Sequence, residues 1–315
     1  MSTPQPRLNV GLTNFGRAGD PEALLNAATS ADRAGIHGIT VFDHVVLGGN
    51  LDAYPWGEFP SGPDVPWLEP LTLLAMIAGR TTNVRLATGV LIAPLRGATV
   101  LAKTAATLDI ISGGRLDLGV GTGWLDKEYE AAGMNFADRG QLLTDTLAAC
   151  QALWKGGPTS FESPSLSFSD VWCHPTPLQE GGIPIWISGA LHRRNLDRII
   201  NFGSGWLPSP SAPVADVKRG IEILRERLPL AGRDPSQVRV RIALPVVHGQ
   251  DRRPDIDATF AAIPALLAAG ATDVHTPLAL WERALGGAEQ ACAALGGAWR
   301  QYVGAGPATG EEPHQ

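Results

Sequence analysis

The feature of this sequence that most restricts its fold is a repeated alternation of short apolar runs with longer segments of helical periodicity. Short apolar runs between turn residues are typical of buried strands, and apolar positions three and four residues apart are typical of amphipathic helices. Eight such runs occur along the chain, and each is followed by a helical segment. The predicted strands are Leu8–Leu12, Gly38–Phe42, Arg85–Gly89, Arg115–Val120, Ile185–Ser188, Gly205–Leu207, Arg239–Leu244 and Asp273–His275.

Local signals support the helices between these strands. Asp20 before Pro21 is a typical helix start, and Gly113, Gly114 and Gly270 stand where helices should end. Strands that alternate with helices and are apolar enough for burial on both faces predict a (β/α)8 TIM barrel, an α/β fold, rather than an open doubly wound sheet. The predicted helices are Pro21–Ala34, Pro70–Gly79, Thr99–Ile111, Gln141–Trp154, Leu191–Phe202, Val214–Leu228, Ile256–Ala269 and Leu278–Leu295.

A chain of 315 residues is long enough for one such barrel, which we expect over residues 1–302, with a disordered polar tail at 303–315. Two insertions, after the second and fourth strands, break the alternation. The first, Val45–Pro66, is rich in glycine, proline and aromatic residues, and the second, Lys155–Gly182, resembles a small hairpin. We expect both on the face that carries the active site, because long loops in compact domains are usually functional.

Composition excludes several functions. A net charge of −6 without a basic stripe argues against nucleic-acid binding. Three widely spaced cysteines form neither a zinc motif nor a disulfide framework. The first seven residues, M-S-T-P-Q-P-R, lack the apolar stretch of a signal peptide, and no run is long enough to span a bilayer. We therefore expect a cytoplasmic protein without membrane contact.

Asp43 and His44 directly follow the second predicted strand, at the strand end where barrels place catalytic residues. An imidazole can move a proton or hydrogen-bond a reacting atom. We therefore predict His44 as the catalytic acid or base, with Asp43 orienting it or contacting a ligand. The alternative is a loop histidine without a catalytic role. Glu69 and Glu128 fit the first residues of helices.

Glycine-rich strand ends indicate a ligand that lies close to the backbone. Glycine lets backbone approach a flat molecule, and an indole offers a rigid aromatic face. Tight turns are the alternative at both places, and the second loop lacks the last glycine of G-x-G-x-x-G, which disfavours a Rossmann site. The residues concerned are Thr88, Gly89 and Val90 after the third strand, and Gly121, Thr122, Gly123 and Trp124 after the fourth.

A phosphate site is predicted after the fifth strand. Ser188, Gly189 and Ala190 lead into a helix whose first turn contains Arg193, flanked by His192 and Arg194. Free amides at a helix N-terminus beside guanidinium groups are suited to phosphate. A solvated charged first turn is the equal alternative.

From about Leu8 to Asp273 the chain resembles the bacterial luciferase-like monooxygenase superfamily, and within it the branch that uses the deazaflavin coenzyme F420. The resemblance is carried by several motifs together. They are Asp43-His44, the run L-A-K-T-A-A-T-L-D-I-I-S-G-G-R-L-D-L-G-V-G-T-G-W from Leu101 to Trp124, Glu128, Arg139, P-T-P-L-Q at Pro175–Gln179, I-P-I-W-I-S-G at Ile183–Gly189 and G-S-G-W at Gly203–Trp206.

This resemblance implies a barrel with F420, or alternatively FMN, across its mouth. It implies that Asp43 and His44 line the reacting face, that the Gly89–Val90 peptide is cis, and that members are often homodimers. It also implies a cofactor channel formed by Gly121, Thr122, Gly123 and Trp124, and a phosphate site formed by Ser188, Gly189 and Ala190.

We predict an F420-dependent oxidoreductase that moves a hydride between the deazaflavin and a small organic substrate. Trp124 replaces the acidic residue found in the sugar-phosphate dehydrogenases of that branch, and with Trp56 and Trp67 it indicates an apolar or aromatic substrate. The alternatives are an FMNH2-dependent two-component monooxygenase and a non-catalytic cofactor-binding barrel. A flavin or F420 reductase is the expected protein partner. Metal-ligand spacings are missing from the sequence, which disfavours a metal-dependent hydrolase.

Overall fold

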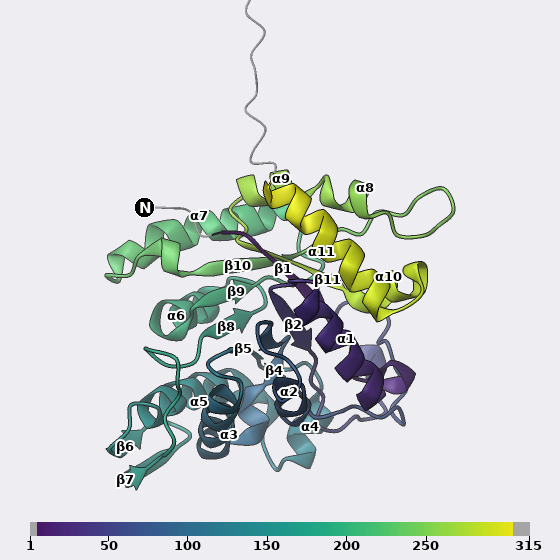
Figure 1. Ribbon diagram of the computed structural model, residues 1–315. Helices are drawn as coiled ribbons and strands as arrows, with labels where there is room; N and C mark the ends of the chain where they lie inside the picture. The colour runs from purple at the N-terminus through teal and green to yellow at the C-terminus, as the bar shows by residue number, and fades with distance from the viewer. Residues whose placement is uncertain (1–4, 305–315) are drawn as a thin grey trace, which may run out of the picture.

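The computed structural model describes residues 5–304, in which eight parallel strands close into a barrel surrounded by helices (Figure 1). Each strand pairs in parallel with its neighbours, and pairing of β3 with β5 and of β11 with β1 completes the ring. The predicted (β/α)8 TIM barrel is therefore confirmed. The barrel strands are β1 (Arg7–Gly11), β2 (Gly38–Val41), β3 (Arg85–Thr88), β5 (Leu116–Gly121), β8 (Ile185–Ser188), β9 (Gly205–Leu207), β10 (Arg239–Ala243) and β11 (Asp273–Pro277).

All eight barrel strands lie within two residues of their predicted bounds. The sequence did not indicate the short strand β4 (Leu91–Ile92), which pairs with β5 beyond the end of β3. A cis peptide bond between Gly89 and Val90 separates β3 from β4, as the family resemblance implied. The chain therefore leaves the barrel wall at Gly89 and returns to it at Leu91.

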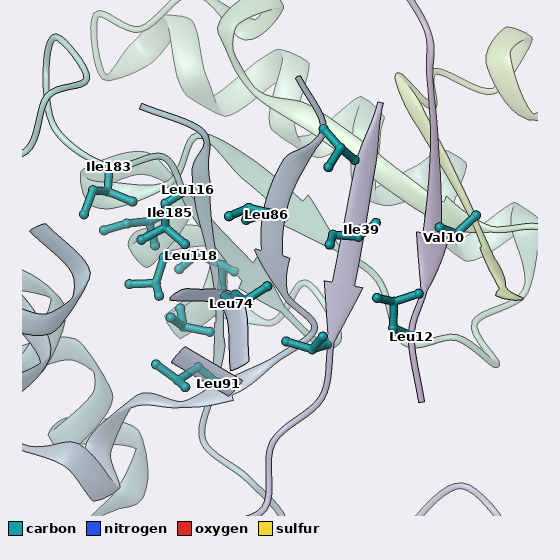
Figure 2. Close-up of a cluster of buried hydrophobic side chains, with 14 of the residues drawn as sticks. Val10, Leu12, Ile39, Leu74, Leu86, Leu91, Leu116, Leu118, Ile183 and Ile185 are labelled. Carbon is teal, nitrogen blue, oxygen red and sulfur yellow. The ribbon is translucent and has the colours of Figure 1, made fainter. Parts of the chain in front are cut away.

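The main core lies between the strands and the surrounding helices. Val10, Ile39, Leu86 and Leu118 are fully buried and belong to one apolar cluster, which includes Leu74 of a covering helix (Figure 2). Strand residues alternate between the two faces of the barrel wall, so these aliphatic positions hold the helices while their neighbours point inward.

The interior of the barrel is polar and filled by side chains. Arg241 of β10 reaches across to β2, where it donates to the hydroxyl of Thr40 at 3.3 Å, and its guanidinium lies 4.5 Å from the ring centroid of Trp186. A Cβ atom at Gly205 would lie 2.2 Å from that indole, so glycine is required beside it. Because the bore is filled, a ligand must bind at the mouth.

The covering helices begin and end close to the predicted positions. Asp20 accepts a hydrogen bond from the Ala23 amide at the start of α1, and Gly113, Gly114 and Gly270 all have positive φ, as predicted for helix ends. The predicted helices did not include the short helix α4, although Glu128 in its first turn was predicted to lie at a helix start. The helices are α1 (Pro21–Arg33), α2 (Pro70–Ala78), α3 (Ala98–Ile111), α4 (Asp126–Ala131), α5 (Arg139–Leu153), α6 (Arg193–Phe202), α7 (Val214–Leu230), α8 (Ile256–Phe260), α9 (Ile263–Ala268), α10 (Leu278–Leu285) and α11 (Ala288–Gly304).

Two segments predicted as single helices are each divided in two. The helix expected at 256–269 breaks between α8 and α9, where Pro264 occupies the first turn of α9 because it cannot donate an interior helix hydrogen bond. The helix expected at 278–295 breaks at Gly286 and Gly287, whose φ angles of 91° and 135° do not fit a right-handed helix. Apolar periodicity continued across both breaks and concealed them.

Only the first of the two insertions contributes to the cavity at the mouth, which corrects the prediction that both line the active-site face. Residues 45–66 follow β2 and reach the mouth. Residues 155–182 follow α5 and contain the predicted hairpin, formed by β6 (Pro158–Glu162) and β7 (Ser167–Trp172). A covering helix returns the chain toward the amino-terminal end of the next strand, and the hairpin that follows it packs beside α5 (Figure 1).

The carboxyl-terminal helix also corrects one boundary. Residues 303 and 304 belong to α11, so the disordered tail predicted from 303 does not begin there, and its remainder lies outside the described residues. Within residues 5–304, no helix is both long enough and apolar enough to cross a membrane.

Candidate active site

A cavity of about 860 Å³ opens where the barrel strands end. Its walls come from the loops after β1, β2, β3, β5 and β8 and from the first turns of α5 and α6. This volume lies near the upper end of the range of about 300–1,000 Å³ for small-molecule sites. The residues predicted from sequence that line it are Asp43, His44, Gly89, Val90, Gly121, Thr122, Gly123, Trp124, Ser188, Gly189 and Ala190.

His44 lines this cavity and is held by Glu128 of α4. Its Nδ1 lies 3.2 Å from Glu128 Oε2, and the Val45 amide donates to Glu128 Oε1 at 2.8 Å. A carboxylate only accepts hydrogen bonds, so Nδ1 carries a proton and donates it. Within the described chain, Nε2 has no hydrogen-bond partner. In the neutral imidazole, Nε2 is therefore an acceptor available to a ligand.

Glu128 replaces Asp43 in the role that the sequence suggested. Glu128 does begin a helix, as predicted, but its carboxylate is buried and orients His44. Asp43 instead accepts two hydrogen bonds from Arg96, at 2.7 and 2.8 Å, and one from the Ile92 amide. Burial raises the pKa of Asp43 and the guanidinium opposes that rise. Asp43 thus fixes the backbone beside the cis peptide and does not touch the imidazole.

The glycines at the end of β5 let the chain pack closely against the side chains that follow β3 on one side of the cavity. A Cβ atom at Gly121 would lie 3.0 Å from Val90 Cγ2, and Gly123 has a φ of 68° that L side chains rarely adopt. Thr88, predicted as a cofactor residue, does not line the cavity. Its side chain is fully buried and donates to the Gly119 carbonyl, so its role is to join β3 to β5.

One end of the cavity is cationic. Arg194 and Arg198 of α6 and Arg139 of α5 line it, next to the backbone of Ser188–Ala190. Arg198 is held by Asn195 and by the Gly140 carbonyl, and Arg139 lies 3.9 Å over the Phe136 ring.

Arg193, the guanidinium chosen from sequence, lies outside this group. Its side chain is 95% exposed and is 4.0 Å from Asp197. Helix geometry explains the error, because adjacent residues on a helix point about 100° apart and only Arg194 faces the cavity.

The other end of the cavity is aromatic. The ring of His44 lies 4.8 Å from Trp67, 5.2 Å from Phe59 and 5.9 Å from Trp124, in each case edge to face. Tyr54 contacts Trp56, Phe59 and Trp124, each at 5.2 Å between ring centroids. Phe15 stacks on Trp67 at 4.1 Å. We call these six rings, from Phe15, Tyr54, Trp56, Phe59, Trp67 and Trp124, the aromatic wall.

Within residues 5–304, no group of three or more His, Cys, Asp or Glu side chains is arranged to hold a metal ion. The three cysteines are buried and free.

The described chain matches a known family along almost its entire length. A family model described as luciferase-like monooxygenase matches residues 6–301, and the chain belongs to this family.

Curated proteins with similar sequences include both flavin-dependent and F420-dependent proteins. An uncharacterised protein of Mycobacterium tuberculosis is 31% identical over 53% of this chain and 58% of its own length. The oxygenase component of a flavin-dependent trigonelline monooxygenase from Acinetobacter baylyi is 32% identical over 53% of this chain and 42% of its own length. The chain thus spans less than two thirds of these two relatives. An F420-dependent hydroxymycolic acid dehydrogenase from M. tuberculosis is 27% identical over 88% of this chain and 72% of its own length.

Solved structures confirm the architecture. The monooxygenase RslO1 from Streptomyces bottropensis aligns with a TM-score of 0.74 at 19% identity, covering 94% of this chain and 98% of that one. An F420-dependent secondary alcohol dehydrogenase aligns with a TM-score of 0.69 at 15% identity, covering 87% of this chain and 93% of that one. At these identities the likeness shows the fold alone.

Proposed function

We propose that this luciferase-like barrel is a coenzyme F420-dependent oxidoreductase that moves a hydride between the deazaflavin and a small organic substrate. The observation that carries the proposal is the His44–Glu128 pair at the cavity, which presents an imidazole acceptor atom where a substrate would react. The F420-dependent relative, whose match covers 88% of this chain, supports the choice of cofactor.

The cavity fits a flat, phosphate-bearing cofactor. Glycine backbone at 121 and 123 and the cis peptide offer a surface that a planar ring can approach closely, and the arginines of α5 and α6 offer cations to a phosphate. The first amides of α6 add N–H donors, since a helix leaves its first N–H groups without partners inside it. Arg194 and Arg198 would hold the phosphate, and Gly121–Gly123 would lie against the ring.

Bound F420 would supply the hydride acceptor or donor that no side chain provides. The chain's own side chains would carry out the proton transfer that accompanies hydride transfer. Nε2 of His44 takes a proton from the substrate when hydride leaves a carbon that bears a hydroxyl, and returns it in the reverse direction. Glu128 accepts the hydrogen bond from Nδ1 and so keeps Nε2 of the neutral ring free to take that proton.

An FMNH2-dependent monooxygenase is the second candidate. The trigonelline monooxygenase, 32% identical over half of this chain, favours it, and it would require a flavin reductase as partner. We also propose that the chain forms a homodimer, which light scattering would report as twice 33.2 kDa.

Anaerobic calorimetric titration with F420, reduced F420, FMN and reduced FMN separates the two candidates. We expect tighter binding of F420 than of FMN. Arg194→Gln should weaken cofactor binding at least fivefold, since it removes a charge-assisted phosphate contact, whereas the matched change Arg193→Gln on the neighbouring exposed residue should leave it unchanged. Tight FMN binding without F420 affinity would reject the first candidate.

A further inference from the structure

The aromatic wall gives the cavity an uncharged end. Phe59 is only 9% exposed and touches His44, Tyr54, Trp67 and Trp124, so it ties the wall together. The residues come from the loop after β1, from the 45–67 segment and from the loop after β5. Two of these segments contact the imidazole that would exchange a proton with the substrate, and Phe15 of the third stacks on Trp67.

The charged side chains that line the cavity lie at its α5 and α6 end or are already paired. Its arginines, within residues 5–304, are Arg139, Arg194 and Arg198, all at the α5 and α6 end, and no lysine of that range lines it. The carboxylate of Asp43 is paired with Arg96. A substrate anion beside the neutral imidazole of His44 would therefore lose its hydration without gaining a cation, which is costly.

The spacing of the rings leaves no room for an ammonium group between them. Tyr54, Phe59 and Trp124 have mutual centroid distances of 5.2 to 5.4 Å. Aromatic side chains in direct contact have centroids about 4.5–7 Å apart, so these rings leave no space between them. An ammonium cage needs rings that surround a cation at up to about 6 Å from each centroid. The rings form a continuous apolar surface and not a cage.

We propose that the substrate of this site is a neutral, ring-containing organic molecule that packs against Tyr54, Trp56 and Trp124, with its reacting carbon beside His44 Nε2. This inference rests on the proposed function, because it places the substrate between the aromatic wall and a redox ring. Apolar area removed from water supplies the affinity, and the edge-to-face rings fix the orientation of a flat ligand.

Three probes of nearly the same shape test the charge preference. They are 4-tert-butylacetophenone, which is neutral, its trimethylammonium isostere 4-(trimethylammonio)acetophenone, and the anion 4-acetylbenzoate. Each is titrated by calorimetry into the full-length protein, both free and saturated with whichever of F420 and FMN binds. We expect the neutral probe to bind at least tenfold more tightly than either charged probe.

Substitutions locate the binding surface. Trp56→Leu and Tyr54→Leu should each weaken binding of the neutral probe at least fivefold. Trp172→Leu is the matched control, because this indole is 62% exposed on the hairpin and does not line the cavity, and it should change the affinity less than twofold.

A charged probe that binds as tightly as the neutral one would overturn the inference, as would failure of all three probes to bind, or unchanged affinity in both wall variants. Failure of the proposed function is a separate result, since it would appear as missing F420 affinity while the preference of the cofactor-free protein for the neutral probe remained.

Discussion

Replacement of Glu128 by glutamine tests how the site controls the proton of His44. The Val45 amide can only donate, so the glutamine oxygen must take the place of Oε1, which turns the NH2 group toward His44. Nδ1 must then accept a hydrogen bond, and the proton of the neutral ring moves to Nε2. The acceptor atom that faces the cavity is lost although the geometry is kept.

The magnitudes separate this effect from unfolding. Hydrogen bonds to charged groups contribute about 1.5–3 kcal/mol and neutral ones about 0.5–1.5, so Glu128→Gln should cost about 1–2 kcal/mol of stability. Loss of a positioned general base lowers turnover by about 10²–10⁴-fold. Turnover of any substrate found for the protein should therefore fall by that factor in a protein that remains folded.

Nitrogen-15 NMR of the histidine rings measures the tautomer without any substrate. The chain has 7 histidines, and His44→Asn identifies the relevant signal. We expect the Nδ1–H form in the parent protein and the Nε2–H form in Glu128→Gln. The matched control is Glu130→Gln, which removes an exposed carboxylate two residues further along the chain and should leave the tautomer unchanged. Retention of Nδ1–H in Glu128→Gln would refute the reasoning.

Three further predictions concern stability. Burial, with a contribution from a nearby arginine, lowers the pKa of His275 to about 3. Below pH 6.5 the unfolded chain therefore binds a proton at this residue that the folded chain does not bind. The free energy of unfolding, measured by urea titration, should fall by about 2 kcal/mol from pH 7.5 to pH 5, and His275→Asn should reduce this loss. Arg96→Ala leaves the buried Asp43 carboxylate without its cation and should lower the free energy of unfolding by about 3–5 kcal/mol in the same assay. Adding Asp43→Asn should recover part of this loss. An unchanged urea midpoint in Arg96→Ala would contradict the ion pair. Gly205→Ala forces a methyl group into the indole of β8 and should cost about 1–3 kcal/mol, whereas Gly297→Ala, which meets no atom within 4 Å inside α11, should be neutral or stabilising in thermal melts.

Much of the fold could be predicted from sequence because its signals are local. A strand buried on both faces needs a short apolar run, whatever its partners are, and the eight barrel strands follow from this requirement alone. The capping carboxylate of Asp20 and the positive φ of Gly270 are likewise properties of a few neighbouring residues. The breaks within the two divided helices were not predicted, because apolar periodicity indicates which face of a helix is buried and not whether the helix is continuous.

The site could be predicted only in part. Position at the end of β2 was enough to choose His44, since every barrel strand delivers its last residues to the mouth. The sequence could not show which carboxylate accepts the hydrogen bond from His44. Asp43 and Glu128 are equally suitable acceptors, and 84 residues separate His44 from Glu128. The choice of Arg193 over Arg194 failed for a similar reason. The two residues are adjacent in α6, and only the packed helix shows which of the two side chains faces the cavity.

The sequence by itself thus determined the barrel, the place of its active-site mouth and the chemical types of residue that reach that mouth. The tertiary structure decided which carboxylate holds the imidazole, which guanidinium groups face the cavity, and that six aromatic rings from three segments form one surface. The physical reason is that periodicity, capping and turn chemistry act between near neighbours, whereas hydrogen bonds and ring contacts depend on distances that only the closed barrel sets.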